Sequence, residues 1–258
     1  MNDNVMFDSH AHYDDKAFDE DRTEILSSLP SMGVCGVINC ASDLSSAEKS
    51  IAMAEAYPFV YAAAGVHPHE AEAEGEFDRD RLARLLSHPK TVALGEIGLD
   101  YHYNFSPKEK QLLYFEEQLR LSCELSLPVI VHDREAHQDT MTLLQKYRPK
   151  GVVHCYSGSV EMAKELIKMG LYLGLGGAVT FKNAKTPLEV AKEIPLEFLL
   201  LETDAPYMTP VPFRGKRCHS GLIKYTAEKI AEVRNVPVET VYETIKENTY
   251  QLFNISRE

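Results

Sequence analysis

The sequence lacks the features of a membrane or secreted protein. None of its apolar runs approaches the roughly 20 residues that a membrane-spanning helix requires. Its first residues, MNDNVMFDSHAH, lack the basic region and the apolar core of a signal peptide. The cysteines are scattered and include no CxxC pair; they are Cys35, Cys40, Cys123, Cys155 and Cys218. We therefore expect neither a disulfide framework nor a zinc ribbon, and we predict a cytoplasmic protein without a membrane partner.

Basic residues are scarce relative to acidic ones. The chain has 27 Lys and Arg against 39 Asp and Glu, which gives a formal net charge of −12. This charge argues against broad electrostatic binding to duplex DNA, which normally relies on basic patches. It does not exclude a phosphate ester that is held locally by metal ions, because bound cations dominate the field of such a site.

What the sequence does contain is a regular alternation of apolar, β-prone runs with amphipathic stretches. Its 258 residues match one (β/α)8 barrel, for which about 250 are typical. Eight short apolar runs suit parallel strands that are buried on both faces: Val5–Asp8, Gly33–Asn39, Phe59–Gly65, Thr91–Glu96, Pro128–His132, Gly151–His154, Leu171–Gly174 and Phe198–Thr203. Helices are expected over Ser45–Tyr57, Asp78–Ser87, Ser106–Leu125, Ala136–Tyr147, Val160–Met169 and Pro187–Ile194.

The ends of some helices carry recognisable signals. Ser106 and Pro107 are expected to provide a cap and then proline at the first helical position, and Ser159 is expected to cap the helix that opens at Val160. A long loop and two further helices, near 222–234 and 238–253, follow the last strand. We predict an α/β fold, a (β/α)8 TIM barrel forming a single domain over 1–258, with an additional C-terminal helix. A doubly wound open sheet is the alternative.

The first strand runs into an HxH pattern, His10-Ala-His12. Side chains of a strand alternate between faces, so both imidazoles point the same way and can bind one cation together. Alone the pattern is weak, since two surface histidines would also produce it. Its position at the end of an apolar strand favours a metal site.

The fourth, fifth and sixth strands end in further candidate ligands. Glu96 closes an apolar run between two glycines, where an unpaired carboxylate would be costly to bury. A solvent-exposed glutamate at the strand end remains the alternative. His132 and His154 end the next two strands. One such histidine is more often a hydrogen-bonded core residue, but two on neighbouring strands, with HxH on the first, indicate ligands.

The eighth strand ends in Glu202-Thr-Asp204, whose two carboxylates share a face among leucines. The carboxyl ends of all barrel strands meet at the face where active sites lie. Imidazole and carboxylate ligands suit zinc, iron, nickel or manganese, and magnesium is also considered; the ligands are numerous enough for two divalent ions, with Glu96 as the natural bridge. The predicted metal ligands are His10, His12, Glu96, His132, His154 and Asp204.

Seven ordered motifs give the sequence a resemblance that covers essentially the whole chain. They read FDSHAH, AAAGVHPH, ALGEIGLDYHY, PVIVHDRE, VVHCYSGS, LLLETDAPYMTP and PFRGKR. In order and spacing they resemble the TatD family of metal-dependent DNases, which belongs to the amidohydrolase-like metal barrels. The resemblance implies one metal held by His10, His12, Glu96 and Asp204, and a second held by Glu96, His132 and His154. It also implies phosphodiester hydrolysis, commonly from 3′ ends. One departure follows PFRGKR, where Cys218, His219 and Ser220 replace the family's usual Asn, acidic residue and Pro.

Several polar residues near these motifs are candidates for substrate binding. Each also has a plain structural explanation, such as a packed histidine, a surface salt bridge, a helix cap or a solvated loop. The candidates are His67, His102, Arg134, Ser157, Arg214, Lys216 and Arg217. Glu202 is expected to steady a ligand histidine or a loop backbone instead of binding metal.

We therefore predict a divalent-metal-dependent hydrolase, in particular a deoxyribonuclease or exonuclease that acts through a metal-activated water. Glu96 and Asp204 are the predicted catalytic residues, with Asp204 as general base. The expected partner is nucleic acid as substrate, single-stranded DNA or 3′ ends, and we infer no obligate protein partner. The alternatives are a metal-dependent amide, ester or lactone hydrolase on the same barrel, and a non-catalytic metal-binding protein that has kept the fold.

Overall fold

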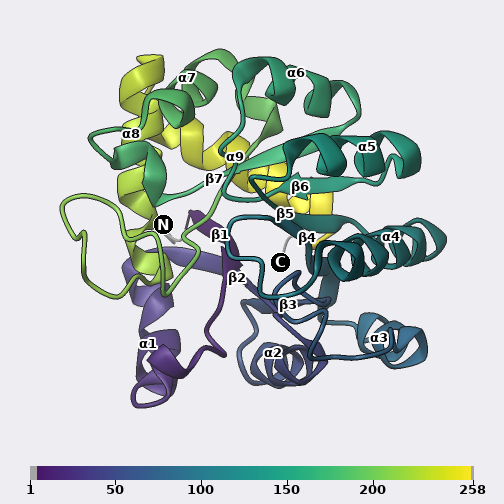
Figure 1. Ribbon diagram of the computed structural model, residues 1–258. Helices are drawn as coiled ribbons and strands as arrows, with labels where there is room; N and C mark the ends of the chain where they lie inside the picture. Colours follow the sequence, from purple (N-terminus) through teal and green to yellow (C-terminus); the bar gives the residue numbers. More distant parts are fainter. Residues whose placement is uncertain (1–4, 257–258) are drawn as a thin grey trace.

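The computed structural model, which describes residues 5–256, is a barrel of parallel strands surrounded by helices (Figure 1). Neighbouring strands pair in chain order from β1 to β8. This confirms the predicted (β/α)8 barrel and excludes the doubly wound order. The strands are β1 (Met6–Ala11), β2 (Val34–Cys40), β3 (Val60–Ala64), β4 (Thr91–Asp100), β5 (Val129–Arg134), β6 (Gly151–Val153), β7 (Leu171–Leu175) and β8 (Leu199–Leu201). Residues 1–4 and 257–258 of the predicted single domain lie outside the described residues.

The helices follow one another around the outside of the barrel (Figure 1). They are α1 (Arg22–Ser28), α2 (Leu44–Ala56), α3 (Arg79–Leu86), α4 (Lys108–Leu125), α5 (His137–Tyr147), α6 (Val160–Lys168), α7 (Lys185–Glu193), α8 (Ile223–Arg234) and α9 (Val238–Phe253). The sequence analysis missed α1, a short helix whose single buried residue is Leu26. No helix within residues 5–256 is long and apolar enough to cross a membrane.

The additional C-terminal helix, α9, passes behind the strands in the view of Figure 1. Its residues Leu252 and Phe253 join a buried cluster with Ile130, Val152 and Leu200. Each of these three strand residues lies two positions before a predicted site residue, on the same face of its strand. The cluster therefore fills the lower interior of the barrel, and the predicted site residues lie above it, toward the carboxyl ends of the strands.

Several strands extend beyond their predicted carboxyl ends, β1 and β4 the furthest. β1 continues through the polar residues Asp8, Ser9 and His10, which are almost completely buried. β4 continues past Gly98 to Asp100 and pairs with β5 along this extension. Gly98 has a φ of +145°, and a Cβ at this position would lie 1.9 Å from the carbonyl oxygen of His132. Only glycine therefore lets β4 approach β5 so closely.

The first and last strands meet at a narrow seam. β1 and β8 share no continuous ladder, and only an isolated bridge joins Ala11 to Ala205. The buried carboxylate of Asp8 strengthens the seam, since it accepts hydrogen bonds from the backbone N–H (2.9 Å) and the hydroxyl (2.6 Å) of Thr203. β8 ends at Leu201, earlier than predicted, because the N–H of Thr203 donates to the Asp8 side chain instead of to the backbone of a neighbouring strand.

The two predicted caps have different outcomes. Ser159 caps α6 as expected, since its side chain accepts a hydrogen bond from the backbone N–H of Met162. Ser106 does not cap α4: the N-cap residue is Pro107, and the helix begins at Lys108. The Ser106 hydroxyl instead donates to the carbonyl oxygen of His69 at 2.8 Å, so it ties the loop after β3 to the start of α4.

Candidate metal centre

Seven side chains from six strands converge at the carboxyl end of the barrel. His10 lies in β1, Glu96 in β4 and His132 in β5, whereas the remaining four directly follow a strand or lie shortly beyond its end. The structure brings all six predicted metal ligands together and adds His67, which follows β3. The seven residues, which we call the metal-centre cluster, are His10, His12, His67, Glu96, His132, His154 and Asp204.

Glu96 is the centre of the cluster, and its two oxygens face different sets of histidines. Its Oε2 lies 3.1 Å from Nε2 of His10 and 3.4 Å from Nε2 of His12. Its Oε1 lies 2.8 Å from Nδ1 of His132, 2.7 Å from Nε2 of His154 and 3.4 Å from Nε2 of His67. The carboxylate group thus lies between His10 and His12 at one oxygen and His132, His154 and His67 at the other, and the rings of His10 and His154 are stacked 3.9 Å apart.

Asp204 closes the β1 side of the cluster. Its Oδ1 lies 3.4 Å from Nε2 of His12 and 3.8 Å from Nε2 of His10. Its backbone N–H donates to the carbonyl oxygen of His10 at 2.9 Å, so the seam between the first and last strands fixes its position. With a side chain that is 17% exposed, Asp204 faces the opening of the barrel, whereas Glu96 lies deeper.

The electrostatics of the cluster favour an anionic Glu96. Burial opposes ionisation of Glu96, but His154, His10 and His67 outweigh it and hold its pKa well below the usual range. Burial lowers the pKa values of His10 and His67 to about 4. Burial also opposes protonation of His132 and His154, but hydrogen bonds with Asp100 and Glu96 raise the pKa of His132 to about 9, and the charge of Glu96 raises the pKa of His154. A histidine must be neutral to bind a metal ion.

Hydrogen bonds at the far side of the rings orient two of the histidines. Nδ1 of His12 donates to the carbonyl oxygen of Cys40 at 2.8 Å, which turns Nε2 toward the cluster. His132 directs Nδ1 to Glu96 and Nε2 to Oδ2 of Asp100, 3.2 Å away. Carboxylate and carbonyl partners of this kind hold histidine ligands in place at metal sites.

The donor set fits divalent metal ions. Three groups of three ligand atoms each lie within 4.8 Å of one another: His10 with His12 and Glu96, His10 with His154 and Asp204, and His67 with Glu96 and His132. Nε2 of His10 and Nε2 of His12 lie only 3.0 Å apart, a distance at which both lone pairs can face one cation. Imidazole with carboxylate suits zinc and the other first-row divalent metals.

Comparison with known proteins agrees with this geometry. Residues 7–254 match the model of the TatD related DNase family. The chain belongs to the TatD family. It is 42% identical over 255 residues to YabD of Bacillus subtilis, named an uncharacterized metal-dependent hydrolase, covering 98% of this chain and all of that protein. A protein of Escherichia fergusonii named 3′-5′ ssDNA/RNA exonuclease TatD is 33% identical over 260 residues, covering 97% and 100% of the two chains.

A solved structure confirms the fold. The crystal structure of YjjV, a TatD homologue from Escherichia coli, superposes with a TM-score of 0.91 at 32% sequence identity, over 98% of this chain and 100% of that one. Together with the donor set, the family and its relatives named as metal-dependent hydrolases show that this TatD-family chain uses divalent metal.

Glu202 lies behind the metal-centre cluster. Its side chain is fully buried and its Oε1 accepts the backbone N–H of Cys155, the residue after His154. Burial raises the pKa of Glu202 to about 8. Nδ1 of His154 is 3.9 Å from the same oxygen. This placement holds the end of β6 and leaves Glu202 out of the ligand groups.

Asp100 is a residue whose importance the sequence analysis missed. Its side chain is buried, and Oδ2 lies 3.2 Å from Nε2 of His132 and 2.8 Å from Nε2 of His69. Hydrogen bonds with His132 and His69 and with the backbone of Tyr103 hold its pKa below the usual range despite burial. Its sequence position two residues beyond Gly98 suggests an exposed loop residue. Only the extension of β4 reveals its role.

The candidate substrate residues are placed differently from one another. His67 belongs to the metal-centre cluster. Ser157 is exposed, and His102 is exposed and pairs with Glu135 at 2.7 Å. Arg134 lies over the ring of Tyr103, 4.6 Å from its centre. The loops and strand that carry Ser157, His102 and Arg134 all lie at the carboxyl face of the barrel, so these three residues surround the opening, whereas His67 contacts Glu96.

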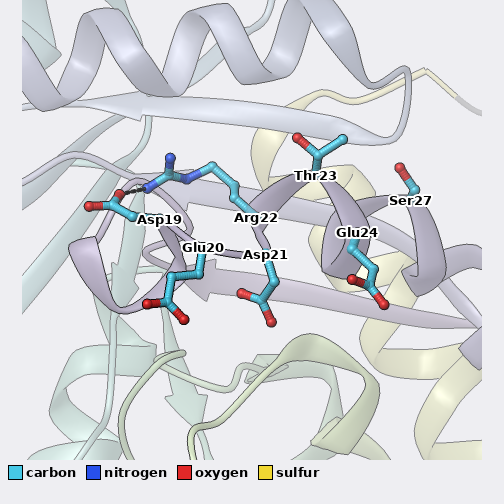
Figure 2. A pocket seen from close by; sticks show the side chains of 7 residues that line it. All are labelled: Asp19, Glu20, Asp21, Arg22, Thr23, Glu24 and Ser27. Carbon is cyan, nitrogen blue, oxygen red and sulfur yellow. Dashed lines mark hydrogen bonds and ion pairs between the residues drawn. The ribbon is translucent and has the colours of Figure 1, made fainter.

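The three cations of the PFRGKR motif do not form one cluster. Arg214 lies over the ring of Phe181, 3.8 Å from its centre, whereas Arg217 forms a bidentate ion pair with Asp21. Lys216 is exposed. The acidic segment that holds Arg217 also lines a surface depression formed by Asp19, Glu20, Asp21, Arg22, Thr23, Glu24 and Ser27 (Figure 2). Its carboxylates make this depression unsuitable for a phosphate.

The departure from the family motif lies in the packed part of the structure. Cys218 and Ser220 are buried, and His219 is partly buried. The Ser220 hydroxyl lies 2.8 Å from the hydroxyl of Tyr13, and its backbone N–H donates to the same oxygen. Residues 218–220 therefore support the segment after the HxH motif.

Proposed function

We propose that this chain is an exonuclease that hydrolyses phosphodiester bonds at the 3′ ends of single-stranded DNA. The observation that carries the proposal is the position of Glu96 between five imidazoles, with Asp204 at the opening. Family membership and the relative named 3′-5′ ssDNA/RNA exonuclease support nucleic acid as the substrate. The net charge of −12 supports a mode of binding in which local cations, not a broad basic surface, hold the strand.

The proposed site holds two divalent ions. The two Glu96 oxygens face different imidazole groups, so Glu96 would contribute a ligand to each ion. One ion would be held by His10, His12 and Asp204 with Glu96. The other would be held by His132 and His154 with Glu96, and His67 lies within reach of the same oxygen.

In the proposed reaction, a water attacks phosphorus, the ester P–O bond breaks, and the leaving oxygen takes up a proton from solvent. Divalent ions bound in the cluster would lower the pKa of the water and stabilise charge on the phosphoryl oxygens. Asp204 accepts the proton of the water as general base. Although Asp204 is largely buried, hydrogen bonding to His12 and the charges of the neighbouring histidines lower its pKa, so the carboxylate is ionised and able to accept. Asp100 and Glu202 keep His132 and the end of β6 in place.

Hydrolysis of end-labelled strands tests the proposal. The metal-loaded protein is incubated with single-stranded DNA labelled at either end, with RNA of the same sequence, and with a lactone and an amide. We expect stepwise shortening of the DNA from its 3′ end. If the protein opens the lactone or the amide and cleaves no phosphodiester, the nuclease proposal is wrong and the alternative hydrolase is supported. If it cleaves none of them with any metal, the non-catalytic alternative is supported.

A metal screen accompanies this assay, since the donor set is compatible with several ions. Protein purified without added metal is analysed for its metal content, stripped, and reloaded with zinc, manganese, magnesium, nickel or iron. We expect two ions per chain at full activity. A maximum at one ion per chain would contradict the bridging role of Glu96.

A further inference from the structure

An exposed stack of aromatic rings lies beside the metal-centre cluster. Phe105 and Tyr103, in the loop after β4, are 65% and 48% exposed. Their ring centres are 5.3 Å apart and their planes differ by only 9°, so the rings are stacked on each other in solvent. Burial of two large apolar rings would stabilise the fold, so their exposure requires an explanation.

One end of the stack is closed and the other is open. The guanidinium of Arg134 lies 4.6 Å from the centre of the Tyr103 ring and closes that end. Phe105 has Tyr103 on one face, and the ring of His69 meets both aromatic rings at nearly right angles. Because Phe105 is still 65% exposed, its remaining face is open to a further flat group.

The stack is connected to the metal-centre cluster by short contacts. His69 lies 4.8 Å from Phe105 between ring centres, and its Nε2 contacts Asp100 at 2.8 Å. Asp100 contacts His132, whose other nitrogen faces Glu96. The ring centres of His69 and His132 are 6.2 Å apart. The open face of Phe105 is therefore near enough for one strand to reach both it and the cluster.

The charge around the stack suits a polyanion. Within residues 5–256, Arg134 makes no ion pair, and its guanidinium is held only over the Tyr103 ring. Arginine stacked on an aromatic ring keeps its N–H donors available for a phosphate. An aromatic face beside such a donor is the combination that binds single strands without reading their sequence.

We propose that Phe105 and Tyr103 form a base-stacking subsite, in which a nucleobase lies on the open face of Phe105 and Arg134 contacts a backbone phosphate. This inference rests on the proposed nuclease function and deepens it, because it names the part of the strand that is recognised outside the cluster. Every base has a flat π face, so the subsite selects unpaired bases over duplex without sequence preference.

The absence of tryptophan from the chain provides a direct test. Phe105→Trp introduces a single indole at the subsite, and Leu113→Trp, at a 51% exposed position on α4, is the matched control. Both changes are made together with Asp204→Asn, so that the strand is not consumed. Each metal-loaded protein is titrated with an oligothymidylate and with an abasic strand of equal length. We expect the oligothymidylate to quench the indole at 105 and the abasic strand to leave it unchanged.

Kinetics of the otherwise native chain give a second measurement. Stacking on an aromatic side chain should favour the base-bearing strand by on the order of 10-fold in KM, and Phe105→Ala should remove most of this preference. Phe105→Tyr should retain it. Equal quenching by both strands, equal quenching at position 113, or an unchanged preference in Phe105→Ala would overturn the subsite.

The two proposals fail in different ways. If the wild-type chain cleaves neither strand, the proposed function is wrong, and base-dependent quenching at position 105 still decides whether the subsite exists. If the wild type cleaves both strands with one KM, the nuclease is supported and the subsite is wrong.

Discussion

The metal-centre cluster and the cations around the opening are held in different ways. His10 has no exposed side-chain surface and His154 only 4%, and both are fixed by strands that pair with neighbours. Arg214 and Lys216 are exposed on a loop, and Arg217 is occupied by Asp21. Residues of the first kind cannot shift without breaking the barrel, whereas residues of the second kind can change partners at little cost. The rate of hydrolysis should therefore depend on the metal-centre cluster, whereas binding of the strand should depend on the cations around the opening.

Removal of metal should give the largest effect. The charge stabilisation that divalent ions supply amounts to several kcal/mol, so hydrolysis should fall by roughly 1000-fold or more. Activity is measured after chelation, with the metal content verified, and again after metal is restored. Glu96→Gln should lower hydrolysis by a comparable factor, because the neutral amide weakens both proposed metal positions together. Unreduced hydrolysis by verifiably metal-free protein would show that the cluster is not the active site.

Asp204→Asn should leave the fold intact and lower kcat by roughly 100-fold or more, because an amide cannot accept the proton of the water. The measurement is kcat at saturating metal and substrate, with metal content determined in parallel. Asp19→Asn is the control, since Asp19 is an exposed carboxylate that pairs with Arg22 outside the cluster (Figure 2). A near-normal kcat in Asp204→Asn would remove Asp204 from the mechanism.

Asp100→Asn should mainly weaken metal binding. The change replaces a charged acceptor of two imidazole N–H groups by a neutral amide with one acceptor oxygen, so the contact that orients His132 is weakened. Losses of about 10- to 100-fold in metal affinity are typical when such partners are changed. Metal affinity is measured by titration, and activity is compared at saturating metal. Asp133→Asn is the neighbouring control, because Asp133 pairs with His137 at 2.7 Å instead. Equal metal affinities in both variants would contradict the positioning role.

The cations of the loop after β8 should give the smallest effect, and they should differ among themselves. Neutralising Arg214 and Lys216 should raise KM for a single strand, and the slope of log affinity against log salt should fall by about 0.7 for each lost phosphate contact. Arg217→Gln should change KM and the salt slope less than the changes at Arg214 and Lys216, because Asp21 already neutralises the charge of Arg217. Surface ion pairs contribute about 0–1 kcal/mol, so its stability should also change little. A larger effect at Arg217 than at Lys216 would show that the ion pair opens for substrate.

The fold and the inner cluster could be predicted because they follow from periodicity. Apolar runs mark the parallel strands. Side chains at the carboxyl ends of barrel strands all lie at the same face of the barrel, so ligands at these positions come together. His10, Glu96, His132 and His154 were brought together for this reason.

The surroundings of the cluster depend on information that is not local. Asp100 lies two residues after Gly98 and resembles a loop residue, yet β4 extends to include it because Gly98 fits against β5. Arg217 finds its partner in Asp21, 196 positions away in the chain. Which loop side chains meet depends on how the loops after different strands fold over the opening, and no spacing within one loop encodes this.

The seam between β1 and β8 has a consequence for biosynthesis. His10 and His12 are made early, but Asp204 and the Thr203 groups that bond to Asp8 emerge only after nearly 200 further residues. Contacts between residues so distant in the chain form late, because the entropy of closing a long loop is lost before these contacts stabilise the structure. During translation the histidines of β1 thus leave the ribosome well before the residues that complete the centre. A truncated chain that stops before β8 lacks Asp204, so the metal-centre cluster stays incomplete until the barrel itself can close.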